Sequence, residues 1–370
     1  MKPAHVLAKF AQSPQTESVY CLIRQKEDDL DAMSRVIQSL QARKISLNAA
    51  AMQKVTALHS SPFKGLFGLD PALFTTLKGK INLIIHAAWP VNFNLPLDSF
   101  ESQMRGLATL IQFSLDVQQQ GQSQPAKLLF CSSISVASRA PASDPGVPEE
   151  LIPDFRYASR TGYARSKLVS EYIIGNAVSE YGADCHILRI GQIVGDSSAP
   201  VVQALPALDE TCAWIPVDIL AEIILELSFT QENQTQLEEE QGPQPQPQPA
   251  LIYNLVNPRA FHWTRDLLPA LKNAGLEFDA LPPGDWVVAL EHSSNSDPTR
   301  CPAMKLLSYF QYRYGVQHES AGIIIPPTFN TTNAQKYAPT LGTVPDLIQL
   351  GIIRRFVQAW NITEARGGQV

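Results

Sequence analysis

The chain has 370 residues, of which 45% are apolar and 17% are charged, and its formal net charge is −6. This composition is typical of a globular protein that buries a sizeable core, and the length suits one large α/β domain or two smaller ones. An acidic chain without a basic patch has no electrostatic basis for binding nucleic acid or an anionic membrane, so we expect neither partner.

The apolar segments are not typical of a membrane protein. Lys9 interrupts the only N-terminal apolar stretch, and the run from Ile81 to Leu97 contains prolines and asparagines that a spanning helix tolerates badly. We therefore expect a cytoplasmic protein. The cysteines are scattered without metal-ligand spacing, which favours buried reduced thiols and no metal site: Cys21, Cys131, Cys185, Cys212 and Cys301.

Short β-rich runs alternate with longer helical runs along residues 1–200. This alternation predicts a mostly parallel, doubly wound sheet covered by helices. The expected strands are Ser18–Ile23, Lys54–Leu58, Ile81–His86, Lys127–Ser132 and Cys185–Ile190. The expected helices are Ala4–Phe10, Asp28–Arg43, Asp70–Leu77, Leu97–Val117 and Tyr163–Tyr181.

The pattern changes after Ile193 to shorter helices and loops. Residues 231–250 contain three consecutive glutamates and alternating proline and glutamine, a composition that builds no core and predicts a flexible surface insertion. A strand from Leu251 to Val256 is expected directly after it. We therefore predict a first domain over 1–200 and a smaller, substrate-side C-terminal subdomain over 201–370.

The most informative residues lie at the end of one expected strand and at the start of the helix after it. Tyr163 and Lys167 stand four residues apart and share one helix face, and Ser133 ends the preceding strand. An ammonium beside a phenol favours the ionised phenol, and a phenol tuned in this way can pass a proton to a carbonyl oxygen. Ser133 would donate a second hydrogen bond to that oxygen as charge develops. This combination predicts a nicotinamide-dependent reductase.

The corner that binds phosphate in a dinucleotide fold is not evident. Such a fold opens with a strand and a Gly-rich turn, which lets the backbone approach a pyrophosphate at a helix N-terminus. Here the first glycine is Gly65, and Met1 is followed almost directly by the helix expected from Ala4. The absent strand is central in the order 3-2-1-4-5-6. Its neighbours then have to close up, find another partner or stay poorly ordered.

Several segments together closely resemble the thioester reductase domains that end many nonribosomal peptide synthetases and adenylate-forming reductases. They are Asn82–Leu97, Cys131–Val136, Tyr163–Lys167, Leu188–Asp196, Trp214–Asp218, Pro302–Leu307 and Ile352–Trp360. These domains are extended short-chain dehydrogenase/reductases related to the male-sterility-type acyl reductases. The resemblance implies a Rossmann-like, NADP-binding domain over 1–200, truncated at its first strand and Gly-rich loop.

The resemblance also implies a reaction. A carrier protein would present an acyl or peptidyl thioester on its phosphopantetheine arm, and NADPH-dependent reduction would release it as an aldehyde or alcohol in secondary metabolism. Ser133 would hydrogen-bond the carbonyl oxygen, Tyr163 would act as the acid, and Lys167 would hold the ribose hydroxyls and tune Tyr163. Arg24 would pair with the adenosine 2′-phosphate. A small-residue floor beneath the cofactor would be formed by His86, Ala87 and Ala88.

Other interpretations stay open from the sequence. Without the Gly-rich segment the chain would be a catalytically inactive, truncated reductase-like protein that at most binds a partner. A sugar-nucleotide epimerase relative would share Ser, Tyr and Lys but not the segment around Trp89. In structural terms, Arg24 would be a solvated charge at a strand end and His86 a buried core imidazole. Ser132 competes with Ser133, because strand alternation allows only one of them to face the site.

Overall fold

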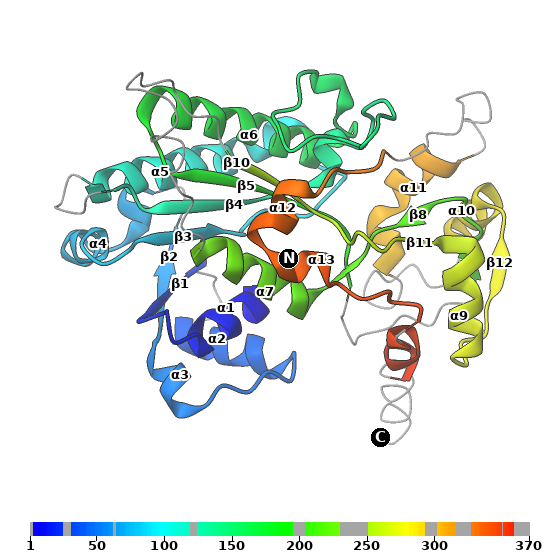
Figure 1. Ribbon diagram of the computed structural model, residues 1–370, viewed down its shortest axis with the longest axis horizontal. Helices are drawn as coiled ribbons and strands as arrows, with labels where there is room; N and C mark the ends of the chain where they lie inside the picture. The colour runs from blue at the N-terminus through cyan, green and yellow to red at the C-terminus, as the bar shows by residue number, and fades with distance from the viewer. Residues whose placement is uncertain are drawn as a thin grey trace.

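The computed structural model describes residues 3–24, 31–61, 64–118, 124–194, 204–229, 251–292, 302–315, 327–349 and 351–358. These residues form an α/β structure in which a parallel sheet lies between helices, with a smaller group of short strands and helices at one end (Figure 1). The main sheet has the strand order β10-β5-β4-β3 and all its neighbours are parallel. Its strands are β3 (Leu83–His86), β4 (Lys127–Ser133), β5 (Cys185–Ile190) and β10 (Leu251–Leu255). The predicted α/β class and parallel sheet are confirmed.

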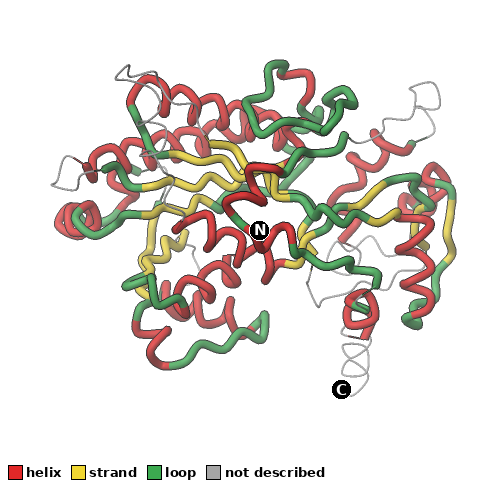
Figure 2. Tube along the Cα trace, in the orientation of Figure 1, coloured by secondary structure: helices red, strands yellow, loops and turns green. Residues whose placement is uncertain are grey.

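Helices cover both faces of this sheet, as Figure 2 shows. Side chains on β4 alternate between them: Leu128 and Phe130 pack with α5 (Glu101–Gln118) and α6 (Gly162–Tyr181), while Leu129 and Cys131 pack on the opposite side. The helices of that opposite side are α1 (Pro3–Gln12), α7 (Val217–Phe229), α12 (Thr332–Tyr337) and α13 (Pro339–Gly342). Burial on both faces explains why β4 and β5 are almost continuously apolar in sequence.

Strands β1 (Val19–Arg24) and β2 (Val55–Ser60) form a separate two-stranded parallel sheet. Val19 nevertheless packs in the same hydrophobic cluster as Leu83 of β3, and Tyr20 packs in the same cluster as Ile84, on the other face. β1 and β3 therefore flank one another within a common core, but among the described residues no backbone ladder joins them. None of the three outcomes expected from the sequence is seen, because β1 and β3 are both regular strands and yet no ladder joins them.

The connecting helices begin where a polar side chain caps them. Asp31, Asn48 and Asp70 accept backbone hydrogen bonds at the starts of α2 (Ala32–Gln41), α3 (Ala49–Gln53) and α4 (Pro71–Lys78). The helix expected over Asp28–Arg43 therefore begins at Ala32 in the described residues, and residues 25–30 lie outside them. The helix expected from Leu97 consists of a 3₁₀ turn, η2 (Leu97–Phe100), followed by α5. A further 3₁₀ turn, η1 (Gly65–Gly68), precedes α4.

The smaller part is built from short paired strands and short helices. The strand pairs are β6 (Ile193–Val194) with β9 (Ile215–Pro216), β7 (Ala204–Pro206) with β12 (Asp279–Leu281), and β8 (Thr211–Cys212) with β11 (Phe261–His262). The helices are η5 (Trp263–Leu267), α9 (Leu268–Asn273), α10 (Pro283–Glu291), η6 (Pro302–Leu306) and α11 (Leu307–Tyr314). Residues 352–358 are also helical.

The chain passes between the two parts more than once. β10 and α7 follow residue 200 in sequence, yet β10 extends the main sheet beside β5, and α7 packs against α1. The division into 1–200 and 201–370 stays a proposal. It is only approximate, because β10 and α7 follow residue 200 but pack with the first part. The predicted flexible insertion at 231–250 lies outside the described residues.

The described cysteines are free thiols, and burial raises their pKa values. The pKa is raised to about 11 for Cys21 and Cys131 and to about 12 for Cys185 and Cys212. The prediction of buried, free thiols is confirmed for Cys131, Cys185 and Cys212, whereas Cys21 is only half-buried. Cys301 lies outside the described residues. In the part of the chain that the structure describes, no helix is both long enough and apolar enough to cross a membrane.

Candidate active site

Ser133 and Tyr163 meet where β4 ends and α6 begins. The Ser133 hydroxyl lies close enough to the Tyr163 phenol to oppose the rise in pKa that burial causes there. Thr161 caps α6 by accepting a hydrogen bond from the backbone N–H of Ala164 (3.2 Å). A Cβ atom on Gly162 would overlap the carbonyl oxygen of Leu95, so the close approach of this helix start to the segment before η2 requires a glycine. These contacts fix the position of Tyr163 at the edge of the sheet.

Lys167 is buried, with 2% of its surface exposed. Its Nζ donates a hydrogen bond to the carbonyl oxygen of Cys131 (2.6 Å) and lies 4.3 Å from the ring centroid of Trp89 and 4.5 Å from that of Phe130. The Tyr163 ring centroid is 6.0 Å from the same nitrogen. The structure thus brings Ser133, Tyr163 and Lys167 together, and it encloses the ammonium among aromatic faces that attract a cation.

The expected effect of Lys167 on Tyr163 is wrong. Burial raises the pKa of Tyr163, and the nearby Ser133 hydroxyl offsets this only in part. The ammonium donates to the Cys131 carbonyl and lies over the Trp89 ring, and the burial of the phenol determines the direction of the phenol's pKa shift. Tyr163 therefore carries its proton at neutral pH, which is the form that a proton donor needs.

Burial lowers the pKa of Lys167 from 10.5 to about 7, although Cys131 and Glu171 oppose this shift. Below pH 7 the folded and unfolded chains both hold this proton, whereas between 7 and 10.5 the unfolded chain binds one more proton. We therefore expect the stability of the wild type, relative to Lys167→Met, to rise with pH across that window. The folding equilibrium should change by up to about tenfold per pH unit.

Urea unfolding of both proteins between pH 6 and 10 measures this difference. Lys80→Met is the matched control, because Lys80 is exposed and its loss should leave the pH dependence unchanged. A stability difference between wild type and Lys167→Met that is constant across the range would contradict the burial of a titrating ammonium.

His86, at the end of β3, belongs to the group of aromatic rings around Lys167. Its ring centroid lies 5.9 Å from those of both Phe130 and Trp89. Burial and the nearby charge of Lys167 lower the pKa of His86 to about 3, so the imidazole is neutral. Its Nε2 is buried without a hydrogen-bond partner among the described residues. Ala87 is half-buried and Ala88 is exposed directly after the strand.

The side chain of the adjacent Ser132 points away from the site, toward Glu171. Its hydroxyl donates to Glu171 (2.6 Å), and Glu171 is paired with Arg189 of β5 (2.7 Å), with both charged side chains fully buried. Arg189 also donates to the carbonyl oxygens of residues 148 and 150. The expectation that only one of the two serines faces the site is confirmed. The buried ion pair joins α6 to β5 and thereby holds Tyr163 and Lys167 over β4.

Glu171 and Arg189 were not among the residues predicted for the site. Two signals were available: Glu171 continues the i, i+4 row of Tyr163 and Lys167, and Arg189 is a charge within an otherwise apolar buried strand. A buried charge of this kind needs a partner, because its desolvation is otherwise uncompensated.

Arg24 lies at the exposed end of β1, opposite Ser60 of β2. Its carbonyl oxygen accepts a hydrogen bond from Arg35 (2.5 Å). Arg24 belongs to the small β1–β2 sheet, whereas the other candidate residues surround β3, β4 and α6. Its suggested role at a 2′-phosphate stays a prediction.

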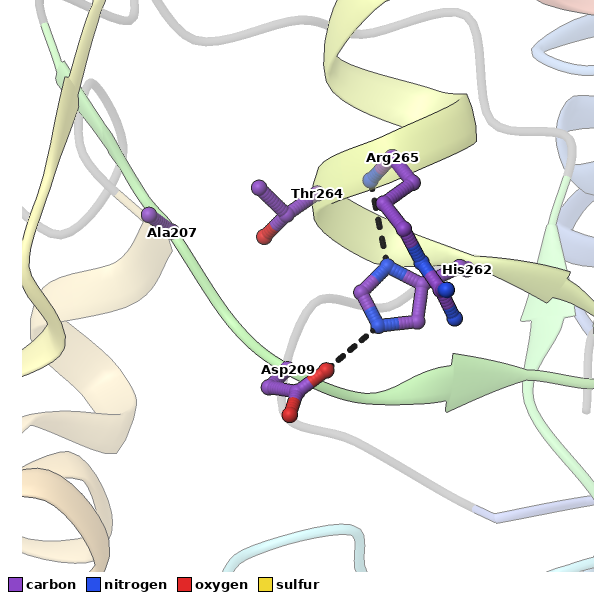
Figure 3. Close-up of a pocket in the computed structure, with 5 residues that line it drawn as sticks. All are labelled: Ala207, Asp209, His262, Thr264 and Arg265. Carbon is purple, nitrogen blue, oxygen red and sulfur yellow. Dashed lines mark hydrogen bonds and ion pairs between the residues drawn. The ribbon is translucent and has the colours of Figure 1, made fainter.

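A pocket of about 560 Å³ in the smaller part is lined by Ala207, Asp209, His262, Thr264 and Arg265 (Figure 3). His262 contacts Asp209 through Nε2 (2.7 Å), and its Nδ1 accepts a hydrogen bond from the backbone N–H of Arg265 (3.1 Å). Both ring nitrogens are therefore engaged, and His262 caps η5. This Asp–His contact has no free nitrogen for acid–base chemistry, so we place the active site at Tyr163.

The comparisons with known proteins concern the family and the fold of the chain. The family model described as male sterility protein, a family of NAD-binding domains, matches residues 4–207, more than half of the chain. The chain belongs to this family. The relationship expected from the sequence is thereby confirmed.

Two relatives illustrate how the chain compares with longer proteins. It is 27% identical over 386 residues to a 3-methylorcinaldehyde synthase of Talaromyces stipitatus and 26% identical over 387 residues to an adenylate-forming reductase of Heterobasidion annosum. Each alignment covers 97% of this chain, but only 13% and 33% of the respective relative. The chain thus spans a third or less of the length of these relatives.

The fold matches a solved reductase domain. The terminal R domain from the myxalamid PKS-NRPS biosynthetic pathway superimposes with a TM-score of 0.74 at 20% identity, over 100% of this chain and 88% of that domain. The extended short-chain dehydrogenase/reductase fold that the sequence predicted is therefore confirmed.

Proposed function

We propose that this chain is a reductase domain that releases an acyl or peptidyl thioester from the phosphopantetheine arm of a carrier protein, using NADPH. The observation that carries the proposal is the convergence of Ser133 and Tyr163, with Lys167 buried behind them, in a chain of this family. Relatives named as an aldehyde synthase and an adenylate-forming reductase support the reaction class. The product would be an aldehyde, or an alcohol after a second reduction.

The side chains around Tyr163 fit the nicotinamide and ribose half of the cofactor. The buried Nε2 of His86 has no partner among the described residues, and an unmatched buried nitrogen costs about 1–3 kcal/mol. A ribose or amide group would satisfy it. Lys167 uses one of its three N–H donors on Cys131, which leaves donors for ribose hydroxyls. Ala87 and Ala88 are small enough to lie beneath a planar ring.

The pyrophosphate half fits less well. Residues 1–64 contain no glycine, and α1 begins at Pro3, which has no backbone N–H to donate. The described start of α1 therefore offers no Gly-rich turn that would cradle a pyrophosphate.

The residues of the site divide the chemistry between them. NADPH, when bound, supplies the hydride. Ser133 donates a hydrogen bond to the thioester carbonyl oxygen, and Tyr163 transfers its proton to that oxygen as negative charge develops there. The resulting thiohemiacetal then breaks its C–S bond, which releases the aldehyde and returns the thiol of the carrier arm.

Steady oxidation of NADPH in the presence of an acyl-pantetheine thioester, with trapping of the aldehyde, tests the proposal. Binding of the thioester without any reduction, even in a form of the chain that binds NADPH, would favour the inactive partner-binding alternative. Failure of the thioester to bind at all would overturn the substrate class.

Arg24→Ala tests the preference for NADPH. If Arg24 pairs with the 2′-phosphate, its loss should weaken NADPH by about ten- to a hundredfold and leave NADH nearly unchanged, because a charge-assisted hydrogen bond contributes about 1.5–3 kcal/mol. Calorimetric titration with both cofactors measures the difference. Arg105→Ala is the control, since Arg105 is exposed and paired with Glu101 on α5. Equal weakening of both cofactors would show that Arg24 does not recognise the phosphate.

A further inference from the structure

The ring of Tyr163 is the first of three aromatic rings in a row. The Phe93 ring lies 5.4 Å from Tyr163 with an interplanar angle of 46°, and the Tyr309 ring lies 5.4 Å from Phe93 at 59°. Phe93 comes from the segment between β3 and η2, and Tyr309 comes from α11, more than two hundred residues later in the chain. We call Phe93 and Tyr309 the aromatic pair.

The aromatic pair is not part of the packed core. Both rings are half-buried, and neither belongs to a hydrophobic cluster of the described residues. α11 instead packs into its core through Leu307, Phe310 and Tyr314, with Phe310 edge-on to Trp286 (4.9 Å). Packing of the helix therefore does not account for the position of Tyr309.

A polar network holds Tyr309 against Phe93. The Tyr309 hydroxyl accepts a hydrogen bond from Arg313 (3.0 Å), and Arg313 is paired with Glu210 (2.7 Å). Tyr314 donates to the same carboxylate (2.9 Å). The ring is thus fixed from its hydroxyl end, while the ring itself contacts Phe93 and Phe310, with 5.6 Å between the Tyr309 and Phe310 centroids.

The aromatic pair adjoins the Tyr163 ring, beside which the acyl group has to lie. The reacting carbonyl must be within hydrogen-bond reach of Ser133 and Tyr163. On the inner side of Tyr163 the space is filled by Lys167 and the rings around it, all buried or half-buried. The rest of the acyl group therefore meets the half-buried rings of the aromatic pair. Two tilted rings present faces and edges that favour another aromatic ring over a saturated one of the same size.

We propose that Phe93 and Tyr309 bind the acyl group and select an aromatic acyl thioester. This inference rests on the proposed function, and it adds a substrate class and two specificity residues to it.

Two thioesters that differ only in the planarity of one ring test the inference: S-benzoyl-pantetheine and S-cyclohexanecarbonyl-pantetheine. Isothermal titration of the full chain should show about three- to tenfold tighter binding of the benzoyl thioester. Tyr309→Leu and Phe93→Leu, which keep apolar volume but remove the ring, should each bring the two dissociation constants close together. Nuclear Overhauser contacts between the benzoyl protons and both rings provide a second measurement that needs no variant.

Two control variants test whether the preference depends on the Tyr309 ring itself, and not on its hydrogen bond or on another aromatic residue of α11. Tyr309→Phe keeps the ring and loses only the hydrogen bond from Arg313, so it should retain the preference. Tyr312→Leu removes an aromatic residue of the same helix that is 43% exposed and contacts Arg160, and it should also retain the preference.

The outcomes distinguish this inference from the proposed function. Equal binding of both thioesters by the wild type would overturn the aromatic selection but leave a thioester site intact. A preference that survives both leucine variants, without contacts to either ring, would overturn the choice of residues. If neither thioester binds, the proposed function fails, and this inference fails with it.

Discussion

Adding a strand and a TGxxGxxG turn ahead of Ala4 should convert the 370-residue polypeptide from a weak to a tight binder of NADPH. The reason lies in the break between β1 and β3, which line the same hydrophobic clusters without sharing a ladder. A strand placed between them would pair with both edges, and its turn would aim backbone N–H groups at the pyrophosphate from the start of α1. Two charge-assisted hydrogen bonds from backbone N–H groups to the pyrophosphate would increase the affinity for NADPH by at least about a hundredfold.

Fluorescence titration and calorimetry of both polypeptides measure this gain. The matched control is the same graft with valine in place of the turn's first two glycines, which should repair the sheet without restoring cofactor binding. Amide hydrogen exchange should slow along β1 and β3 in both grafted forms, because their open edges become paired. Tight NADPH binding by the unmodified polypeptide would contradict the prediction and show that another segment binds the phosphates.

The regular elements of the main sheet could be predicted because burial leaves a clear trace in sequence. β4 and β5 are apolar runs of nearly the expected length, and the helix expected from Asp70 begins directly after that residue, which caps it. The short strands of the smaller part left no such trace, since two- and three-residue pairings depend on distant partners. The position of β10 in the main sheet could not be predicted either, because its pairing with β5 joins segments that are far apart in the sequence.

The site was predictable in its members but not in its electrostatics. The spacing of Tyr163 and Lys167, and the strand end at Ser133, follow from helix and strand periodicity. The direction of the Lys167 ammonium does not, because a flexible side chain follows the nearest carbonyl and aromatic faces, here Cys131 and Trp89. The expected lowering of the Tyr163 pKa is not found, because burial raises it. Tyr309 could not be associated with Tyr163 from the sequence, as no local pattern relates α11 to α6.

Tyr163→Phe should reduce the turnover of a carrier-bound or pantetheine thioester by about 10²–10⁴-fold in a form of the chain that binds NADPH, because it removes the proton donor. Ser133→Ala should cost roughly 10²–10³-fold through loss of one hydrogen bond to the developing oxyanion. Burial raises the pKa of Tyr163 above its ordinary value of 10, so the wild-type rate should not fall through this group until the pH exceeds 10.

Tyr172→Phe is the matched control for this prediction. Tyr172 lies on the same helix, and its hydroxyl donates to the carbonyl oxygen of Ile152 (2.6 Å) rather than to a residue of the site. Its removal should lower the free energy of unfolding by about 1 kcal/mol and leave the turnover number unchanged. Stopped-flow measurement of NADPH oxidation distinguishes a loss of catalysis from a loss of stability, because it reports the rate of the chemical step directly. Full activity in Tyr163→Phe would show that another group protonates the carbonyl oxygen, and would remove Tyr163 from the mechanism.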